Sequence, residues 1–126
     1  MQITRRFTKP DQDVFDTVEW EQRSSRITNA DGSLVFEMND AMIPKAWSQL
    51  ATDIMVSKYF RKAGVPQLAE DGTPILDEQG NTTTGPERSA RQVIHRLAGC
   101  WRACGEKHGY FVTADDAQVF YDELCW

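Results

Sequence analysis

The sequence predicts an α+β fold, mainly helical, in which an N-terminal β-hairpin precedes about three amphipathic helices and a long exposed loop. Three observations support this fold class: an alternating apolar pattern around a turn sequence, helical apolar spacing in three later segments, and a stretch rich in turn residues. The chain has 126 residues, of which 40% are hydrophobic and 26% are charged. This size and composition are typical of a single globular domain.

The hairpin is expected in the segments VEWEQRSSRI and TNADGSLVFEM. Between the two runs, Asn29, Asp31 and Gly32 are residue types that tolerate a positive φ in a tight turn. Apolar and other side chains alternate from Leu34 to Met38, as in a half-buried strand. Because two strands are not stable alone, we expect the hairpin to pack on another element, which we identify as the first helix.

The first helix is predicted in AWSQLATDIMVSKYFRKAGVP, from Ala46 to Pro66. Pro44 suits a first helical turn, where its missing N–H group is not needed. Apolar residues recur at i, i+3, i+4 and i+7 from Trp47 to Ile54, and Gly64 followed by a proline is a typical helix stop. The aromatic side chains of this segment are interpreted as packing against a core or an interface.

The composition changes between Gln67 and Pro86. LAEDGTPI is followed by LDEQGNTT, so Leu-x-Glu-x-Gly is repeated after eight residues, and turn residues dominate. Two copies are too few for a repeat architecture. We therefore expect an exposed loop in the form of a small flap, with turns at Asp71–Gly72 and Gln79–Gly80.

Two further helices are predicted in PERSARQVIHRLAGCWRACGEKHG and TADDAQVFYDELCW. Thr113 is a good N-cap for the third helix, and two aspartates in its first turn complement the helix dipole. Gly105 and Gly109 are expected to loosen the end of the second helix. The residues expected to be mostly buried are Trp47, Leu50, Ile54, Val93, Leu97, Trp101, Phe120 and Leu124, the first seven within one shared core.

Charge and composition exclude several classes of protein. The net charge of −5 disfavours a general nucleic-acid binder. No apolar run approaches the roughly 20 residues of a membrane span, and the twin arginine of TRRF is not followed by the apolar region of an export signal. Three cysteines form no even disulfide framework, so a cytoplasmic location is expected.

Cys100, Cys104 and His108, with His95 nearby, are the only metal-like group in the sequence. They could share a face of an unbroken helix, but zinc usually takes ligands from two separate segments. Cysteines buried on the inner face of the helix are the commoner outcome. Cys104 and His108 could also form a nucleophile–base pair, yet neither has an orienting partner in the sequence.

The second helix region also carries Arg88, Arg91, Arg96 and Arg102. These arginines could bind phosphate groups, but a solvated helix face is the favoured interpretation. The sequence contains no glycine-rich phosphate-binding motif. It therefore assigns no catalytic, no cofactor-binding and no metal-binding residue.

Several uncommon strings occur in a specific order along the chain: WSQLATDI, KYFRKAGVP and, near the end, GYF followed by DA and DEL. From about Phe15 to Trp126 the chain resembles the N-terminal region of adenosylcobalamin-dependent, class II ribonucleotide reductases. In that family the region precedes a ten-stranded α/β barrel. Cobalamin there generates a thiyl radical on a barrel cysteine, and two further cysteines reduce the ribose.

Cys100, Cys104 and Cys125 match no catalytic cysteine of that family, so the resemblance carries over no catalytic residue. It implies that residues 1–126 form one N-terminal scaffold segment whose barrel is absent. The implied partners are the rest of the reductase and, through it, a ribonucleotide, with adenosylcobalamin held by the full enzyme and not by this segment. A truncated product, a split subunit and a cloned fragment all remain open, as does the alternative of a free-standing helical interaction module.

Overall fold

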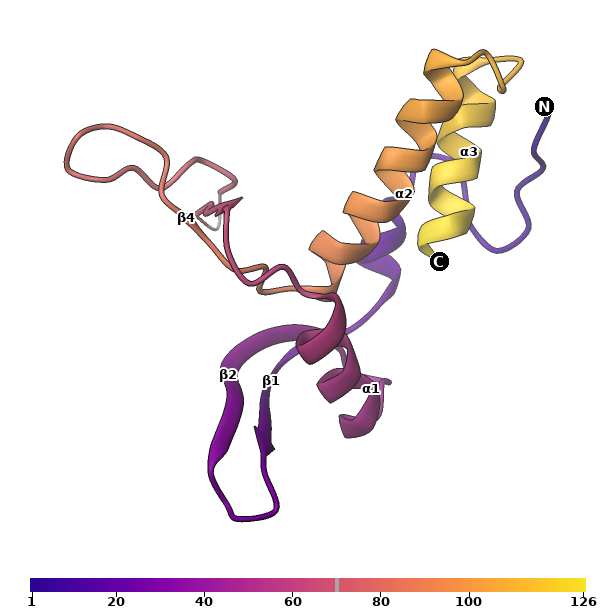
Figure 1. Cartoon of the computed structure of the whole chain (residues 1–126). Helices are drawn as coiled ribbons and strands as arrows, with labels where there is room; N and C mark the ends of the chain where they lie inside the picture. Colours follow the sequence, from indigo (N-terminus) through magenta and orange to yellow (C-terminus); the bar gives the residue numbers. More distant parts are fainter. Residues whose placement is uncertain (70) are drawn as a thin grey trace.

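The computed structural model of the chain describes residues 1–69 and 71–126, so position 70 of the predicted flap lies outside the described residues. Figure 1 shows three parts that extend in different directions from a shared centre: a hairpin, a flap and a pair of helices. In chain order, the elements are η1 (Val14–Thr17), β1 (Trp20–Thr28), β2 (Leu34–Pro44), α1 (Gln49–Ile54), η2 (Met55–Tyr59), β3 (Val65–Pro66), β4 (Thr84–Gly85), α2 (Ala90–Lys107) and α3 (Ala114–Cys125).

The α+β class and the N-terminal hairpin are confirmed. β1 and β2 pair antiparallel around a turn in which Gly32 has a φ of 85°, a conformation that favours glycine. The register shifts between Arg23 and Ser25, which marks a bulge. Because the strands take nine and eleven residues, a mainly helical composition is not clearly confirmed.

The first helix is shorter than predicted. It begins after Ser48, whose hydroxyl accepts a hydrogen bond from the N–H of Ala51, and it ends at Tyr59 rather than near Pro66. Pro44 is the last residue of β2 and not part of the helix, because a strand end tolerates a missing N–H donor. The final turn, η2, is π-helical, and the N–H of Phe60 donates to the carbonyl of Met55.

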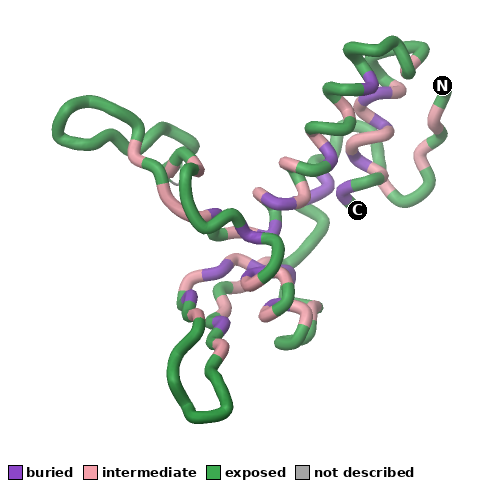
Figure 2. The backbone as a smooth tube through the Cα atoms, in the orientation of Figure 1, coloured by how far each residue is buried: buried purple, intermediate pink, exposed green. Residues whose placement is uncertain are grey.

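The segment after η2 forms the predicted exposed flap. The short strands β3 and β4 pair at its base, and the turns close with hydrogen bonds from Gly72 N to Ala69 O and from Gly80 N to Asp77 O. Both turn positions therefore agree with the sequence prediction. Figure 2 shows the exposed path of the flap away from the rest of the chain.

The two predicted C-terminal helices are present as α2 and α3, which lie side by side, and both begin with capping boxes, at Ser89 and Thr113. The prediction that Gly105 loosens α2 is wrong, because the helix continues through it to Lys107. A Cβ atom at position 105 would lie 2.5 Å from the ring of Phe111. Glycine is therefore required there for the close packing of the aromatic ring that precedes α3.

The prediction of one shared core is also wrong, because the buried residues form two clusters. The first joins the hairpin, η2 and the start of α2, and contains Ile43, Val56 and Val93. The second joins η1 to α2 and α3, and contains Phe15 and Cys125. The partly buried side chain of Trp20 packs against both clusters.

Five of the eight residues expected in the core are exposed, whereas Val93 is buried and Trp47 and Phe120 are partly buried. On α1, the hairpin contacts the side of the helix that carries the fully buried Thr52, so the apolar stripe faces outward. The helix pair similarly buries small side chains, such as Ala98 and Ala117. The five exposed residues and their exposed fractions are Leu50 (69%), Trp101 (53%), Ile54 (47%), Leu124 (43%) and Leu97 (39%).

Ile43→Ala should lower the free energy of unfolding by about 2–5 kcal/mol, because the side chain is fully buried in the first core and its removal leaves a cavity. Leu50→Ala is the matched control, since its side chain is mostly exposed, and it should change stability by less than about 0.5 kcal/mol. Urea unfolding of the isolated chain measures both. Equal losses from the two variants would contradict the assignment of the outward face.

Candidate functional site

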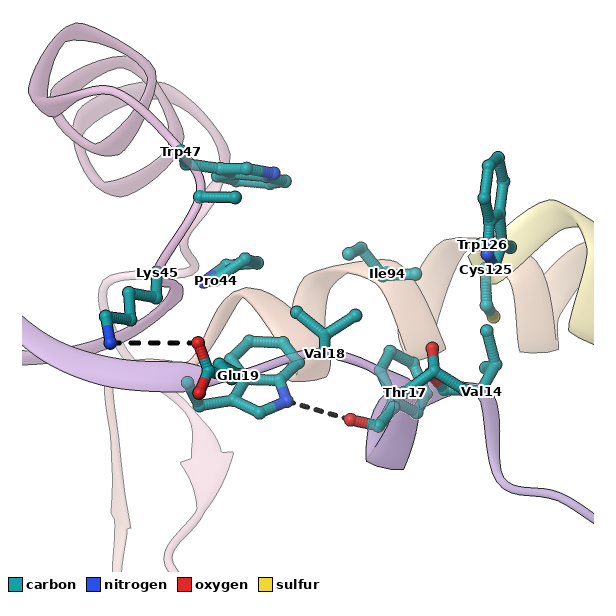
Figure 3. A pocket seen from close by; sticks show the side chains of 13 residues that line it. Val14, Thr17, Val18, Glu19, Pro44, Lys45, Trp47, Ile94, Cys125 and Trp126 are labelled. Atoms are coloured by element: carbon teal, nitrogen blue, oxygen red, sulfur yellow. Dashed lines mark hydrogen bonds and ion pairs between the residues drawn. The ribbon is translucent and has the colours of Figure 1, made fainter.

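The candidate site is an uncovered apolar surface on both sides of Trp47. On one side lies a cavity of about 600 Å³, which we call the joint cavity. Its walls come from both halves of the molecule, by which we mean the hairpin with the first core and the helix pair with the second core. Figure 3 shows Trp47 and Pro44 at one end of this cavity and Cys125 and Trp126 at the other. On the other side lies a hollow of about 430 Å³, which we call the helix hollow.

The joint cavity is lined mainly by apolar side chains. Val18 and Trp20, the first residue of β1, line the cavity, and Figure 3 shows Ile94 of α2 between the two ends. The indole N–H of Trp20 donates to the carbonyl oxygen of Phe15 at 2.9 Å, so the polar atom of this ring already has a partner. Glu19 and Lys45 form an ion pair of 3.7 Å, but both side chains are mostly exposed and the pair contributes little stability.

Arg23 holds the wall that the two hollows share. Its guanidinium donates to the carbonyl oxygens of Trp47 and Lys45, at 2.5 and 2.7 Å, and to the hydroxyl of Thr52 at 3.0 Å. The side chain is only 14% exposed, so these hydrogen bonds replace the water that burial removes. The segment that carries Trp47 is thereby fixed to β1 and to α1.

The helix hollow lies along α1 and η2. Its walls are Trp47, Ala51, Ile54, Met55 and Tyr59, with Ser48 as the polar member. The neighbouring side chain of Leu50 is also exposed. A helix face of this composition is typical of a surface that packs against other protein.

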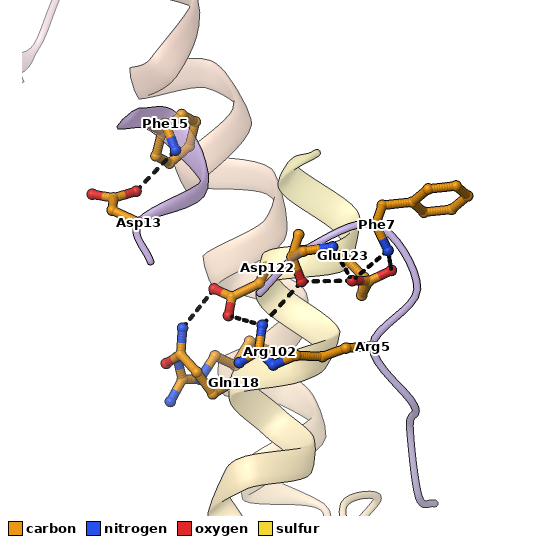
Figure 4. Close-up of polar contacts among 9 residues, drawn as sticks. Arg5, Phe7, Asp13, Phe15, Arg102, Gln118, Asp122 and Glu123 are labelled. Carbon is orange, nitrogen blue, oxygen red and sulfur yellow. Dashed lines mark hydrogen bonds and ion pairs between the residues drawn. The ribbon is translucent and has the colours of Figure 1, made fainter. Parts of the chain in front are cut away.

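The N-terminal strap, residues 1–10, runs beside α3 without regular secondary structure and bends at residues 6 and 7 (Figure 4). The N–H of Ile3 donates to Asp116 at 3.0 Å, and Arg5 forms an ion pair of 2.7 Å with the buried Asp122. Glu123 accepts hydrogen bonds from the N–H and the hydroxyl of Thr8, at 2.8 and 2.5 Å. The ring of Phe7 then stacks on Trp126, with a centroid separation of 4.5 Å.

These contacts stabilise the charged form of two carboxyl groups. The hydrogen bond from the Thr8 hydroxyl, together with N–H donors of the strap, lowers the pKa of Glu123 to about 2. The Thr113 hydroxyl and the N–H of Ile3 likewise lower the pKa of Asp116. At the cavity wall, by contrast, burial raises the pKa of the Cys125 thiol to about 11. Cys125 is therefore a neutral packing residue at physiological pH.

The three metal candidates lie on or at the end of one continuous helix. Cys100 and Cys104 are exposed, which corrects the expectation that these cysteines are buried. His108 is the C-cap of α2 and is also exposed, whereas Nδ1 of His95 lies 2.7 Å from the hydroxyl of Tyr121. No group of three potential metal-ligating side chains comes together within the part of the chain that the structure describes.

The four arginines considered for phosphate binding each pair with a carboxylate. Their partners are Asp40 for Arg88, Asp13 for Arg91, Glu87 for Arg96 and Glu106 for Arg102. Asp40, Asp13 and Glu87 lie in three different segments outside α2, whereas Glu106 lies within α2, so the arginines do not converge on one site. The pairs of Arg91 and Arg96 attach α2 to preceding segments, and the pair of Arg102 lies within the helix.

Glu87 is the most buried partner, and no local sequence pattern predicts its role. Its carboxylate accepts from Arg96 Nε and from the N–H of Arg61, each at 2.8 Å. Burial alone would raise the pKa of Glu87, but these donors hold it below its usual value. The pairing fixes the two ends of the flap, because Glu87 N also donates to Arg61 O.

The sequence patterns also did not predict the roles of η1 and Arg23 next to the joint cavity. The signal for η1 was present as Asp13 followed by the apolar pair Val14–Phe15, because Asp13 accepts from the N–H of Phe15 and caps the turn. Arg23 follows the predicted strand pattern but faces inward, which alternation alone does not predict.

No helix in residues 1–69 and 71–126 is long and apolar enough to cross a membrane.

Comparison with known proteins gives a consistent result. Residues 21–126 match the family model described as class II vitamin B12-dependent ribonucleotide reductase. The chain is 43% identical over 142 residues to the vitamin B12-dependent ribonucleotide reductase of Agrobacterium fabrum, and 36% identical over 128 residues to that of Streptomyces avermitilis. Each match covers 100% of this chain and 11% of the relative. A third relative, from Rhodopirellula baltica, is 38% identical over 112 residues, which is 89% of this chain and 9% of that protein.

Acid should release the N-terminal strap. Because the folded pKa of Glu123 lies below its usual value of 4.5, its contribution to stability is present above about pH 4.5 and is lost as the pH falls towards 2. Amide exchange of residues 3–8, measured by NMR between pH 6 and 2, should report this loss. Glu123→Gln should speed exchange already at pH 6 and weaken the acid dependence, leaving the part due to Asp116.

The matched control is Glu78→Gln, on the exposed flap, which should leave the exchange of residues 3–8 unchanged. A strap that stays equally protected at pH 2 and pH 6 in the unmodified chain would contradict the role assigned to Glu123.

Proposed function

The chain belongs to the class II vitamin B12-dependent ribonucleotide reductase family, and from this premise we propose that it is a non-catalytic N-terminal scaffold of such an enzyme. In this proposal the whole enzyme contains an α/β barrel and uses adenosylcobalamin to reduce ribonucleotides to deoxyribonucleotides for DNA synthesis, by thiyl-radical chemistry. The scaffold packs against the rest of that polypeptide in the cytoplasm.

The uncovered helix hollow is the observation that carries this proposal. Leu50, Ile54 and Tyr59 are 69%, 47% and 56% exposed on one face of α1 and η2. Large apolar side chains gathered on one face mark a protein–protein contact. The chain spans about one ninth of the length of the relatives it matches, so their remaining polypeptide is long enough to cover this face.

The positions of the thiols support a role outside catalysis. Cys100 and Cys104 are exposed on α2, whereas Cys125 is buried at the end of α3 against the second core. Radical reduction of a ribose requires the protein to hold cofactor, substrate and thiols together. Two exposed cysteines and one buried packing cysteine are not arranged around a common pocket, so we assign no catalytic or cofactor-binding residue to this chain.

An interaction module that acts without a reductase is the alternative. It would use the same apolar face, and it differs in the partner that covers that face. A test must therefore supply the reductase polypeptide directly.

The isolated chain should show no ribonucleotide reduction and no tight binding of adenosylcobalamin. A full-length chimera, in which this chain replaces the matching region of the Agrobacterium fabrum enzyme, should reduce ribonucleotides when adenosylcobalamin and a dithiol are supplied. Activity is measured with each ribonucleoside diphosphate and triphosphate. Turnover by the isolated chain would contradict the scaffold role, and an inactive chimera that is folded would contradict a role in the reductase.

Leu50→Glu in the chimera should lower activity at least about tenfold, because a charge would then face the covering polypeptide. Leu76→Glu is the matched control, since Leu76 is 57% exposed on the flap, and it should change activity less than about twofold. Both variants of the isolated chain should unfold at the same urea concentration as the unmodified chain. Equal activity of the two chimera variants would favour the independent interaction module.

A further inference from the structure

We propose that the joint cavity is a socket for apolar side chains from the rest of the reductase polypeptide, and that this contact fixes the two halves of the scaffold relative to each other. The inference rests on the proposed function, which concerns the helix hollow. It adds the joint cavity as a second contact site, and this contact would fix the two halves relative to each other. The contact at the joint cavity and the contact at the helix hollow can be tested separately.

The cavity walls come from both cores. Trp20 and Pro44 belong to the hairpin, whereas Ile94 and Cys125 belong to the helix pair, and Trp126 follows α3. Figure 3 shows Pro44 at one end of the cavity and Cys125 and Trp126 at the other. A group that fills the cavity therefore contacts both halves at once. Without it, the direct apolar link across the joint is the partly buried Trp20, together with α2, whose first turns enter one core and whose middle enters the other.

The size and lining of the cavity favour apolar side chains as its occupant. A volume of about 600 Å³ lies within the range of roughly 300–1,000 Å³ that concave binding sites enclose. A small polar ligand would need convergent polar groups to orient it. Here the indole N–H of Trp20 already donates to Phe15, and the Glu19–Lys45 pair lies at the solvent-exposed rim.

The reductase polypeptide is the occupant that the chain itself indicates. Relatives carry about nine times as much polypeptide as this chain, and the helix hollow that we assign to their contact shares Trp47 with the joint cavity. One continuous surface can therefore cover both hollows. Arg23 fixes the carbonyls of Lys45 and Trp47, so the shared wall is already in place before the contact forms.

Hydrogen–deuterium exchange tests this assignment without measuring activity. Peptides covering residues 14–20 report on the joint cavity, and peptides covering residues 49–59 report on the helix hollow. In the full-length chimera both sets should exchange at least about tenfold more slowly than in the isolated chain. Slower exchange of 49–59 alone would overturn the socket and leave the proposed function intact, whereas no change in either would overturn both.

A charge placed at the cavity provides the second test. Ala46→Glu puts a carboxylate at a lining position, and it should speed exchange of residues 14–20 in the chimera because apolar side chains would then have to bury that charge. Ala30→Glu, at the exposed hairpin turn, is the matched control and should leave that exchange slow. Equal protection in the two variants would overturn the socket. Protection of residues 14–20 that grows with the concentration of the isolated chain would assign the cavity to a second copy, and would overturn the proposal equally.

Discussion

The contact of Trp20 with two hydrophobic cores is the constraint on which the arrangement of this chain depends. Among the described residues, its ring packs against the cluster under the hairpin and against the cluster between η1, α2 and α3. The bond from its N–H to Phe15 fixes the ring relative to η1. Trp20 also lines the joint cavity, so the same side chain connects the two cores and forms part of the wall between them.

Buried polar contacts fix the segments around the two cores relative to one another. Arg23 attaches the Trp47 segment to β1, and Glu87 attaches the end of η2 to the start of α2 through Arg61 and Arg96. Removal of the Arg23 or the Glu87 side chain would leave buried donors or acceptors without hydrogen bonds. The free-energy cost of an unpaired buried group exceeds the net stabilisation that its hydrogen bond provides. Arg23 thus holds the segment that carries Trp47, and Glu87 holds the two ends of the flap, whose exposed backbone path Figure 2 shows.

Local patterns predicted local structure well. The turn at Gly32, the flap turns and the N-cap at Thr113 follow from residue chemistry within a few positions, and the structure has each of them. The burial of the helix stripes was predicted wrongly for Leu50, Ile54 and Leu97, because periodicity identifies an apolar face without saying what covers it. The roles of Trp20, Arg23 and Glu87 depend on contacts between distant segments, which no single-sequence pattern encodes. The family resemblance did predict the outcome of the comparisons, since it rested on rare strings in order rather than on periodicity.

Side-chain labelling can decide whether the apolar face around Trp47 is covered by the rest of a B12-dependent reductase, as we propose. Hydroxyl-radical footprinting compares the oxidation of Trp47 and Tyr59 in the isolated chain and in the full-length chimera, with Tyr110, which is 60% exposed at the far end of the helix pair, as internal reference. Oxidation of Trp47 and Tyr59 should fall at least about fivefold in the chimera relative to that of Tyr110. Unchanged oxidation of both residues in a folded chimera would show that the face is not covered.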